Sequence, residues 1–511
     1  MGFQRDNVPL VGVWGQSPRQ TALRKGKVSM TQVRTRFAPS PTGYLHIGGL
    51  RTALYAWLFA RKHGGVFILR IEDTDLNREV EGAKDVIYNT LRQTGLSYDE
   101  GPDVGGDFGP YIQSERKEIY QEYAEKLIER GAAYRCFCTK ERLAEERAKA
   151  EAQGQTFTYD KHCLHLSAEK IQRKLDAGEP YVIRQNIPRE GDTTYTDAVF
   201  GDITVPNADL DDNVLLKADG MPTYNLANVI DDHLMGITHV IRGVEYLSST
   251  PKYNHLYRAM GWEIPQYIHL PVVMKDKQRK LSKRYGDAAF DDFLKKGYLK
   301  EAIINYIALL GWSPGGEQEI YSLEELIEAF STDGLSKSSA VFDTEKLTWM
   351  NAQYIRALTK EDFIARAMSW FEAAGVADMN LELIAEMIQP RLERLDEIEG
   401  KLSFLVSMPE FGKELYFHKR SGCDAESALP VLKEAKLALE ALNDYSVDTL
   451  KALLAALVEK LGIKNGQLYW PLRIAISGQE VTPGGPVEIA SLLGKAETLR
   501  RLESSIGKLE E

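Results

Sequence analysis

Residues 36–58 read RFAPSPTGYLHIGGLRTALYAWL and combine a short strand, a glycine-rich turn and a helix. Apolar residues alternate with arginines up to Phe37, and Pro39 and Pro41 then end the strand because proline cannot donate an N–H. Apolar residues at the spacing of one helix face follow, namely Leu50, Ala53, Leu54, Trp57 and Leu58. The N-terminus of such a helix presents unpaired N–H groups and the positive end of the helix dipole. The stretch therefore predicts an anion-binding site in an α/β fold.

His46 and the glycines of this turn suit a phosphate ligand. Gly48 and Gly49 carry no side chain, so that a flat base or a phosphate can approach the backbone closely. His46 adds a donor that can follow charge as it grows on a phosphate oxygen. For an isolated His-x-Gly-Gly, however, a glycine turn with a surface histidine is the commoner explanation.

A second stretch, residues 276–286, reads DKQRKLSKRYG. Lys280, Ser282 and Lys283 place two mobile charges and a hydroxyl donor on one loop, a combination that suits a leaving pyrophosphate. Taken alone, the stretch is equally typical of a solvated basic loop. Together the two stretches resemble the H-I-G-H and K-M-S-K-S signatures of class I aminoacyl-tRNA synthetases, in the same order and about 235 residues apart.

The resemblance is closer to one branch of that class. The segments that carry it are FAPSPTG at 37–43, RIEDTD at 70–75, YIQSER at 111–116, residues 222–242 and KLSKR at 280–284. They resemble the bacterial glutamyl-tRNA synthetase family, and the resemblance extends from Thr31 to the end of the chain. Gly49 stands where the class signature has a second histidine, as is common in glutamyl members. His46 is therefore the only imidazole of the motif.

This resemblance implies ATP-dependent attachment of L-glutamate to tRNA(Glu) through a glutamyl-adenylate, with release of AMP and pyrophosphate and with Mg²⁺ on the phosphates. No protein nucleophile is needed, so that catalysis consists of positioning and charge stabilisation. The catalytic residues that it implies are His46, Lys280 and Lys283. The implied ATP-binding residues are Pro39, Gly43, His46, Gly48, Gly49, Lys280, Ser282 and Lys283.

Glutamate carries two carboxylates and one ammonium group, so its pocket must be mainly cationic. The residues that the resemblance assigns to this pocket are Arg36, Ser40, Glu72, Tyr224, Asn228 and Arg242. Arg36 and Arg242 match the positions for the side-chain carboxylate, where bidentate pairing favours glutamate over glutamine. Glu72 suits the ammonium group, and Arg78 and Tyr246 lie in matching segments. Without the motif context, each arginine would be interpreted as a surface or structural charge.

The alternation of strands and helices predicts an α/β N-terminal half with the Rossmann-like nucleotide-binding fold of class I synthetases. A chain of 511 residues exceeds what one core supports, so several domains are expected. We expect a disordered extension at 1–30, the nucleotide fold at 31–130 and 213–275, an inserted acceptor-stem-binding domain at 131–212, a lysine-loop and stem-contact domain at 276–350, and an all-helical anticodon-binding region at 351–511. A glutaminyl enzyme would end in β-barrels instead, and a relative that modifies a tRNA base would lack the last third.

Arg391, in the tripeptide Gln389-Pro390-Arg391, falls where the family reads the third anticodon base. An arginine there implies a preference for glutamate tRNA over glutamine tRNA. A helix-terminal arginine that contacts backbone carbonyls explains the residue equally well.

Three of the four cysteines lie in the insert, as Cys136-x-Cys138 and Cys163-x-His165 with 24 residues between the pairs. Three thiolates and an imidazole are a sufficient tetrahedral zinc set, although Cys-x-Cys is tighter than the usual knuckle. Some glutamyl members bind zinc with this pattern, so the resemblance implies one structural Zn²⁺ on these four residues. The alternatives are reduced, unligated cysteines, or His162 as a ligand in place of His165.

Composition sets further limits on the function. The net charge of −11 argues only weakly against a nucleic-acid partner, because a local basic stripe on an acidic body is what matters. Four cysteines form no disulfide framework and no run of about 18 apolar residues occurs, so we expect a cytoplasmic protein without membrane contact. We also expect a monomer. Residues 1–30 are basic and lack a signal-peptide core. Two other functions stay open: a small-molecule nucleotidyltransferase and a non-catalytic tRNA-binding paralogue.

Overall fold

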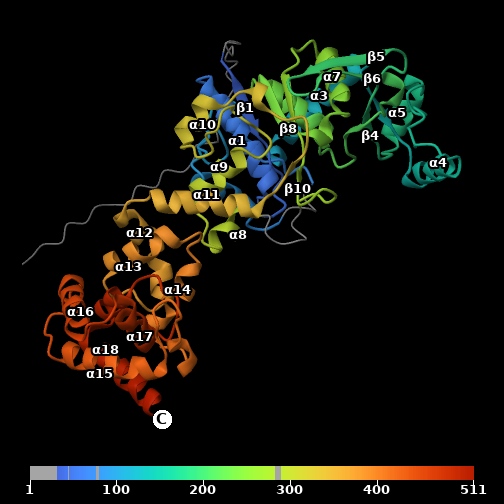
Figure 1. Ribbon diagram of the computed structural model, residues 1–511. Helices are drawn as coiled ribbons and strands as arrows, with labels where there is room; N and C mark the ends of the chain where they lie inside the picture. The colour runs from blue at the N-terminus through green and yellow to red at the C-terminus, as the bar shows by residue number, and fades with distance from the viewer. Residues whose placement is uncertain (1–31, 44, 76–79, 282–288) are drawn as a thin grey trace, which may run out of the picture.

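The computed structural model describes residues 32–43, 45–75, 80–281 and 289–511. Figure 1 shows an elongated molecule in which an α/β body is followed by a helical region, with helix α11 (Thr344–Ala357) where the two meet. The predicted extension at 1–30 and the predicted site residues Arg78, Ser282 and Lys283 lie outside the described residues.

The α/β body is built on a sheet with a parallel centre. Its strands are β1 (Arg34–Phe37), β2 (Val66–Leu69), β8 (His239–Gly243) and β9 (Gln266–Leu270), with the hairpin of β5 (Asp192–Asp197) and β6 (Gly201–Pro206) beside β9. The Thr238 N–H donates to the Arg34 carbonyl at 3.0 Å, so β8 lies beside β1 and the two parallel pairs continue one another. The carboxyl ends of these strands meet at one edge, where α/β sheets bind their ligands. The predicted α/β nucleotide fold is confirmed.

Helix α1 (Ile47–Lys62) crosses from β1 to β2 and is buried on more than one face. The periodicity predicted a single apolar stripe, but Tyr55, Ala56 and Phe59 are buried as well. The outer face is covered by α9 (Lys300–Ala308) and α10 (Leu323–Ala329). The Tyr55 hydroxyl contacts the carbonyls at the end of α9, including that of Ala308 at 3.0 Å. The predicted single buried face of α1 was therefore too narrow. The helices that cover the second face come from a distant part of the sequence, which the local pattern does not reveal.

The other elements of the body are α2 (Ala83–Gln93), α3 (Lys117–Glu129), α6 (Tyr224–Leu234), α7 (Thr250–Met260), α8 (Phe290–Lys295) and the short pair β10 (Val273–Met274) and β11 (Ala340–Val341). Ser114 precedes α3 but lies within a 3-10 turn, η2 (Gln113–Arg116), and its hydroxyl donates to Asp73 at 2.8 Å. The carboxylate of the RIEDTD segment thus anchors this turn.

The insert forms an outlying lobe with its own small sheet (Figure 1). Its elements are β3 (Ala133–Cys136), β4 (Val182–Gln185) and β7 (Val214–Leu216) in antiparallel pairs, with α4 (Lys140–Ala152) and α5 (Ala168–Asp176). The β5–β6 hairpin, which also falls between residues 131 and 212, pairs with β9 and so belongs to the central sheet. The chain therefore crosses between the lobe and the central sheet more than once.

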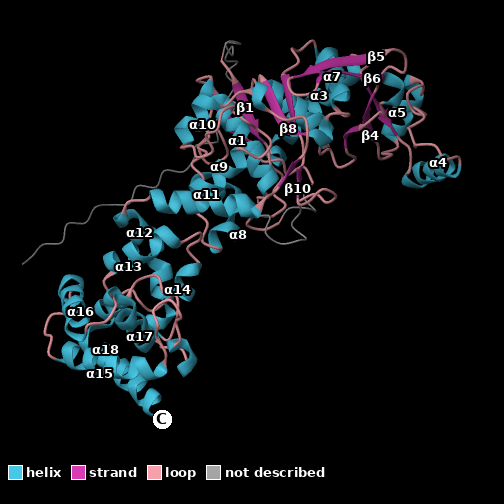
Figure 2. Ribbon diagram, viewed as in Figure 1, coloured by secondary structure: helices cyan, strands magenta, loops and turns pink. Residues whose placement is uncertain are grey.

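The C-terminal region is helical, as Figure 2 shows, and residues 358–511, all of them described, contain no strand. Its helices are α12 (Lys360–Ala373), α13 (Leu381–Ile388), α14 (Glu397–Val406), α15 (Ala425–Glu440), α16 (Val447–Leu461), α17 (Asn465–Ser477) and α18 (Pro486–Glu510). The core of this region includes Leu299 at the start of α9 and Ile355 of α11. The Leu395 N–H also donates to the Gly297 carbonyl at 3.0 Å. The predicted all-α region is confirmed, and it packs against the body.

Candidate active site

The glycine-rich turn leads from β1 directly into the N-terminus of α1. His46 is the N-cap residue of this helix, and its Nδ1 accepts the Gly48 N–H at 3.0 Å. Because Nδ1 accepts, the neutral ring carries its proton on Nε2 and can donate it there. Gly43 has a φ of 115°, a conformation that favours glycine, and a Cβ at Gly49 would lie 3.1 Å from the Leu45 side chain. The first turn of α1 thus offers backbone N–H groups and one imidazole donor to an anion.

Two further predicted residues lie beside this turn. The Glu72 N–H donates to the Pro39 carbonyl at 3.0 Å, which extends the pairing of β1 with β2 beyond the ends of both strands. Pro39 is half-buried and Ser40 is exposed. Pro39, Ser40 and Glu72 therefore lie together at the carboxyl edge of the sheet.

The two described ends of the lysine loop are held in defined positions. Lys280 forms an antiparallel bridge with Met274, and its side chain is exposed. Beyond residues 282–288, Ala289 forms an antiparallel bridge with His46. The chain on the far side of the lysine loop thus returns to the N-cap residue of α1. The chain just beyond the second signature stretch therefore contacts the first stretch, although the two lie far apart in the sequence.

Arg51 of α1 strengthens this connection. Its buried guanidinium donates to the carbonyls of Pro271 and Leu310, the latter at 3.0 Å. Pro271 follows β9 and precedes β10, the strand that leads to the lysine loop. Arg51 therefore ties the helix of the glycine turn to the segment that carries Lys280.

Arg242, at the end of β8, is a buried cation among neutral groups. Its Nε donates to Nε2 of His269 at 3.1 Å, and its Nη2 donates to Oγ1 of Thr250 at 2.7 Å. The guanidinium lies 5.0 Å from the ring centroids of both Tyr246 and Tyr253. The described residues include no carboxylate in an ion pair with it, although it is only 5% exposed. Such a site favours an anionic ligand.

Arg36 is in the opposite situation. Its Nε and Nη2 contact both oxygens of Asp232 at 3.0 and 3.3 Å, and its Nη1 donates to the Ile241 carbonyl at 3.1 Å. Asp232 also pairs with Arg70 at 2.8 Å. Burial alone would raise the pKa of Asp232, but the two guanidinium groups hold it below its ordinary value. The charge of Arg36 is therefore already balanced inside the protein.

The remaining predicted pocket residues surround these arginines. Glu72 is buried and pairs with Arg70 at 3.1 Å; burial raises its pKa, and the charge of Arg70 opposes that rise. Tyr224 stacks on Tyr246 with ring centroids 5.0 Å apart, and burial raises the pKa of its hydroxyl. The Asn228 amide donates to the Tyr224 carbonyl at 2.7 Å, so this side chain is turned toward its own helix.

Comparison with known proteins agrees with this geometry. Residues 32–349 match the family of class I tRNA synthetases (E and Q), catalytic domain, and residues 362–506 match an anticodon binding domain. The chain belongs to the class I tRNA synthetases of the glutamate and glutamine group. A glutamate–tRNA ligase of Clostridium botulinum (strain Hall) is 57% identical over 94% of this chain and 99% of that protein. That of Clostridium tetani is 54% identical over 94% and 98%.

Solved structures give the same result. A glutamate tRNA ligase from Elizabethkingia meningosepticum, in complex with its amino acid, is 36% identical and has a TM-score of 0.86 over 94% of this synthetase and all of that chain. The predicted resemblance is confirmed. None of the described helices is long and apolar enough to cross a bilayer.

The cysteines of the synthetase insert form one cluster. The sulfur atoms of Cys136, Cys138 and Cys163 all lie within 4.8 Å of one another. The Tyr159 hydroxyl is 3.2 Å from the sulfurs of both Cys136 and Cys138. His165 is exposed and is not part of this group. The structure thus brings together three of the four predicted ligands and adds an oxygen donor that the spacing did not indicate.

Arg391 lies in the helical region of the synthetase, at the end of the 3-10 turn η7 (Gln389–Arg391). Its side chain is exposed, and one guanidinium nitrogen donates to the Met387 carbonyl. The Gln389 amide donates to the carbonyls of Ile355 and Leu358, both at 2.9 Å. The turn is therefore fixed on α11, while Arg391 faces solvent.

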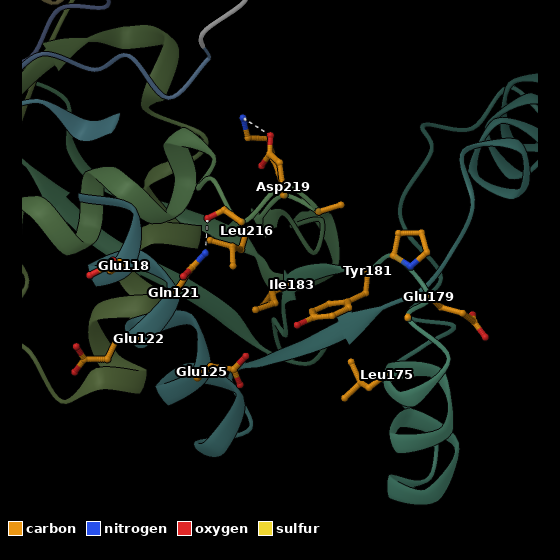
Figure 3. Close-up of a pocket in the computed structure, with 15 residues that line it drawn as sticks. Glu118, Gln121, Glu122, Glu125, Leu175, Glu179, Tyr181, Ile183, Leu216 and Asp219 are labelled. Carbon is orange, nitrogen blue, oxygen red and sulfur yellow. Dashed lines mark hydrogen bonds and ion pairs between the residues drawn. The ribbon is translucent and has the colours of Figure 1, made fainter. Parts of the chain in front are cut away.

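The synthetase also has a cleft away from the glycine turn. A cleft of about 800 Å³ lies between α3 and the insert, and Figure 3 shows carboxylates on both of its sides. These carboxylates belong to Glu118, Glu122, Glu125, Glu179 and Asp219. None of the predicted site residues that the structure describes lines the cleft, and its negative charge would repel phosphate groups.

Several polar groups of the pocket escaped the sequence analysis. Asp232, Thr250 and His269 contact the predicted arginines, yet no motif pointed to them. A signal was present: His269 interrupts the mostly apolar strand QYIHL, and Asp231 and Asp232 directly follow the apolar residues of α6. A buried polar residue inside an apolar pattern requires a hydrogen-bond partner, so such positions indicate a buried polar network.

Proposed function

We infer that this synthetase is a glutamate–tRNA ligase, which uses ATP to join L-glutamate to tRNA(Glu). The observation that carries the inference is the bridge between His46 and Ala289, because it brings the described end of the lysine loop to the glycine turn. The high identity to proteins named glutamate–tRNA ligase and the helical anticodon-binding region support glutamate over glutamine.

The reaction has two steps. The glutamate carboxylate attacks the α-phosphate of ATP, which forms glutamyl-adenylate and releases pyrophosphate; the terminal ribose hydroxyl of the tRNA then takes the glutamyl group and AMP leaves. His46 donates from Nε2 to a phosphate oxygen as charge develops, supported by the positive end of the α1 dipole at Gly48 and Gly49. Lys280 and Lys283 hold the leaving pyrophosphate, with Mg²⁺ entering on ATP to offset phosphate charge. Pro39, Gly43 and Ser282 complete the proposed ATP site.

The two arginines of the amino-acid site have different proposed roles. Arg242 takes the side-chain carboxylate, because it is the buried cation that lacks an acidic partner among the described residues. Arg36 contributes mainly through the network with Asp232, which holds the floor of the pocket. Glu72 takes the ammonium group. Ser40, Tyr224 and Asn228 complete the proposed glutamate site.

The tRNA would lie along the length of the molecule. We propose the insert at 131–212 as the contact for the acceptor stem, residues 276–350 as a stem contact, and Arg391 as a reader of the anticodon. The exposure of Arg391 on a turn that is fixed to α11 supports this role. We further propose that the enzyme acts as a monomer in the cytoplasm.

The cysteine cluster fits a structural zinc ion. Three sulfurs within 4.8 Å of one another are a soft donor set of the kind that zinc prefers. We propose that Cys136, Cys138 and Cys163 hold the ion and that the Tyr159 hydroxyl, rather than His165, is the fourth donor. Such an ion would stabilise the insert and take no part in the chemical steps.

Replacing Tyr159 by phenylalanine is therefore expected to lower the zinc content of the purified enzyme, because the fourth donor is lost. Replacing His165 by alanine should leave the content at the wild-type level, and Cys163→Ser should abolish it. Metal analysis by mass spectrometry after dialysis against a weak chelator measures all three. Loss of zinc in the His165 variant, with retention in the Tyr159 variant, would restore the ligand set predicted from spacing.

The proposed function is tested by charging purified glutamate and glutamine tRNAs separately. We expect rapid attachment of glutamate to tRNA(Glu), together with glutamate-dependent ATP–pyrophosphate exchange when tRNA is present. A small-molecule nucleotidyltransferase would exchange pyrophosphate without any tRNA. A non-catalytic paralogue would bind tRNA(Glu) without turnover, and either outcome would reject the ligase function.

A further inference from the structure

The orientation of Arg242 depends on residues that lie across three neighbouring strands. Arg242 on β8 stands opposite His269 on β9, and Asp197 ends β5, the next strand of the sheet. The His269 Nδ1 lies 2.7 Å from Oδ2 of Asp197, and its Nε2 accepts from Arg242. The side chains of His269 and Asp197 are both fully buried. A continuous polar row therefore leads from Asp197 to the guanidinium.

The proton positions in this row are determined by its ends. A guanidinium can only donate, so Nε2 of His269 must present a lone pair to Arg242. The proton of the neutral ring is then on Nδ1, which donates to Asp197. The other oxygen of Asp197 accepts the N–H groups of Val199 and Phe200, both at 2.9 Å. Asp197 is thereby fixed, and it selects one tautomer and one ring orientation of His269.

Because the imidazole of His269 is a neutral acceptor, it orients Arg242 without cancelling its charge, whereas a carboxylate would cancel it. Asp232 contacts Arg36 directly and balances its charge, whereas Asp197 is separated from Arg242 by an imidazole ring. Thr250, the second acceptor of Arg242, is also neutral, and its hydroxyl donates to the Tyr246 carbonyl at 2.9 Å. Arg242 is thus oriented on two sides, while no carboxylate of the described residues forms an ion pair with its positive charge. Burial lowers the pKa of His269, which agrees with a neutral ring.

We propose that His269, held by Asp197, is a positioning residue that presents Arg242 to the side-chain carboxylate of glutamate and thereby sets the preference for a charged over an uncharged side chain. This inference rests on the proposed function, in which Arg242 binds that carboxylate. His269 does not touch the substrate. It acts through the direction of the guanidinium, which must be fixed for bidentate pairing.

His269→Leu removes the acceptor and fills a similar volume. We expect the KM for glutamate to rise roughly tenfold to a hundredfold, since one hydrogen bond to a charged group is lost, while kcat and the KM for ATP change little. The inhibition constant of glutamine, whose side chain is uncharged, should change far less. The ratio between the affinities for glutamate and glutamine therefore decreases. His269→Gln should recover most of the affinity, because its amide oxygen can accept from Arg242 and its amide nitrogen can donate to Asp197.

His255→Leu is the matched control, because this histidine of α7 lies 2.9 Å from the Thr193 hydroxyl and has no hydrogen bond to Arg242 among the described residues. We expect its KM for glutamate to stay at the wild-type value. If His269→Leu does not fold, Asp197→Asn serves instead, because it reverses the tautomer and should raise the same KM. An unchanged glutamate KM in the folded variant, or a Gln variant as impaired as the Leu variant, overturns the inference. If the wild-type enzyme itself does not charge tRNA(Glu), the proposed function fails instead.

Discussion

Replacing His46 by alanine is expected to lower glutamate-dependent ATP–pyrophosphate exchange by about a hundredfold to a thousandfold, the usual effect of removing one donor from a developing oxyanion. The ring carries its proton on Nε2 because Nδ1 accepts the Gly48 N–H at the start of α1. The affinity for tRNA(Glu) should stay nearly unchanged, since the proposed tRNA contacts lie in other parts of the chain. Exchange assays with tRNA present and filter binding measure the two quantities.

The alanine variant also removes the N-cap of α1, which costs about 1 kcal/mol of stability. His46→Asn separates the two effects, because asparagine retains a capping acceptor for the Gly48 N–H but has no imidazole donor. We expect the asparagine variant to be as slow as the alanine variant and as stable as the wild type. Lys280→Ala and Lys283→Ala should likewise lose rate without losing tRNA affinity. A collapse of tRNA affinity with normal exchange would contradict these assignments.

The parts of the fold that follow from local patterns were predictable from the sequence. The strand, turn and helix around His46 follow from proline, glycine and apolar spacing, and the helical C-terminal region follows from the same spacing over many residues. The burial of Tyr55 and Phe59 was not predictable in this way. Tyr55 contacts the Ala308 carbonyl at the end of α9, and the Phe59 ring lies 4.6 Å from the ring of His239 on β8. Both partners come from distant parts of the chain, and no local period carries that information.

In the site, too, local motifs were predictable and contacts between distant residues were not. Motif context indicated Arg36 and Arg242 as a pair, but their surroundings separate them. The carboxylate of Asp232 lies 196 residues from Arg36 in the sequence and contacts it directly in space. Tyr159 similarly has no recognised metal-ligand spacing, yet its hydroxyl adjoins two cysteine sulfurs. Sequence spacing identifies residues that share a motif. Which charged side chains pair with each other depends on contacts between distant segments, and these are seen only in the structure.

Arg242→Met is expected to raise the KM for glutamate by about a hundredfold to a thousandfold, because it removes one partner of a buried charge pair that forms only with the ligand. The fold should tolerate the change. No described carboxylate forms an ion pair with Arg242. The Thr250 hydroxyl lies 3.3 Å from Nε2 of His269 and can turn from the Tyr246 carbonyl to donate to that nitrogen. Steady-state charging kinetics and thermal unfolding measure the two effects.

Arg36→Met is the matched comparison, because it removes an arginine that already has a carboxylate partner in the protein. It leaves Asp232 buried with Arg70 as its remaining described ion-pair partner, so we expect a loss of about 3 kcal/mol and a clearly lower unfolding temperature. Arg242→Met should unfold within a few degrees of the wild type. If instead the Arg242 variant is the unstable one and the Arg36 variant the one that loses glutamate, then the charge balance assigned to the two arginines is reversed. The contrast works because an arginine with its own carboxylate holds the protein together, whereas an arginine without one is reserved for the ligand.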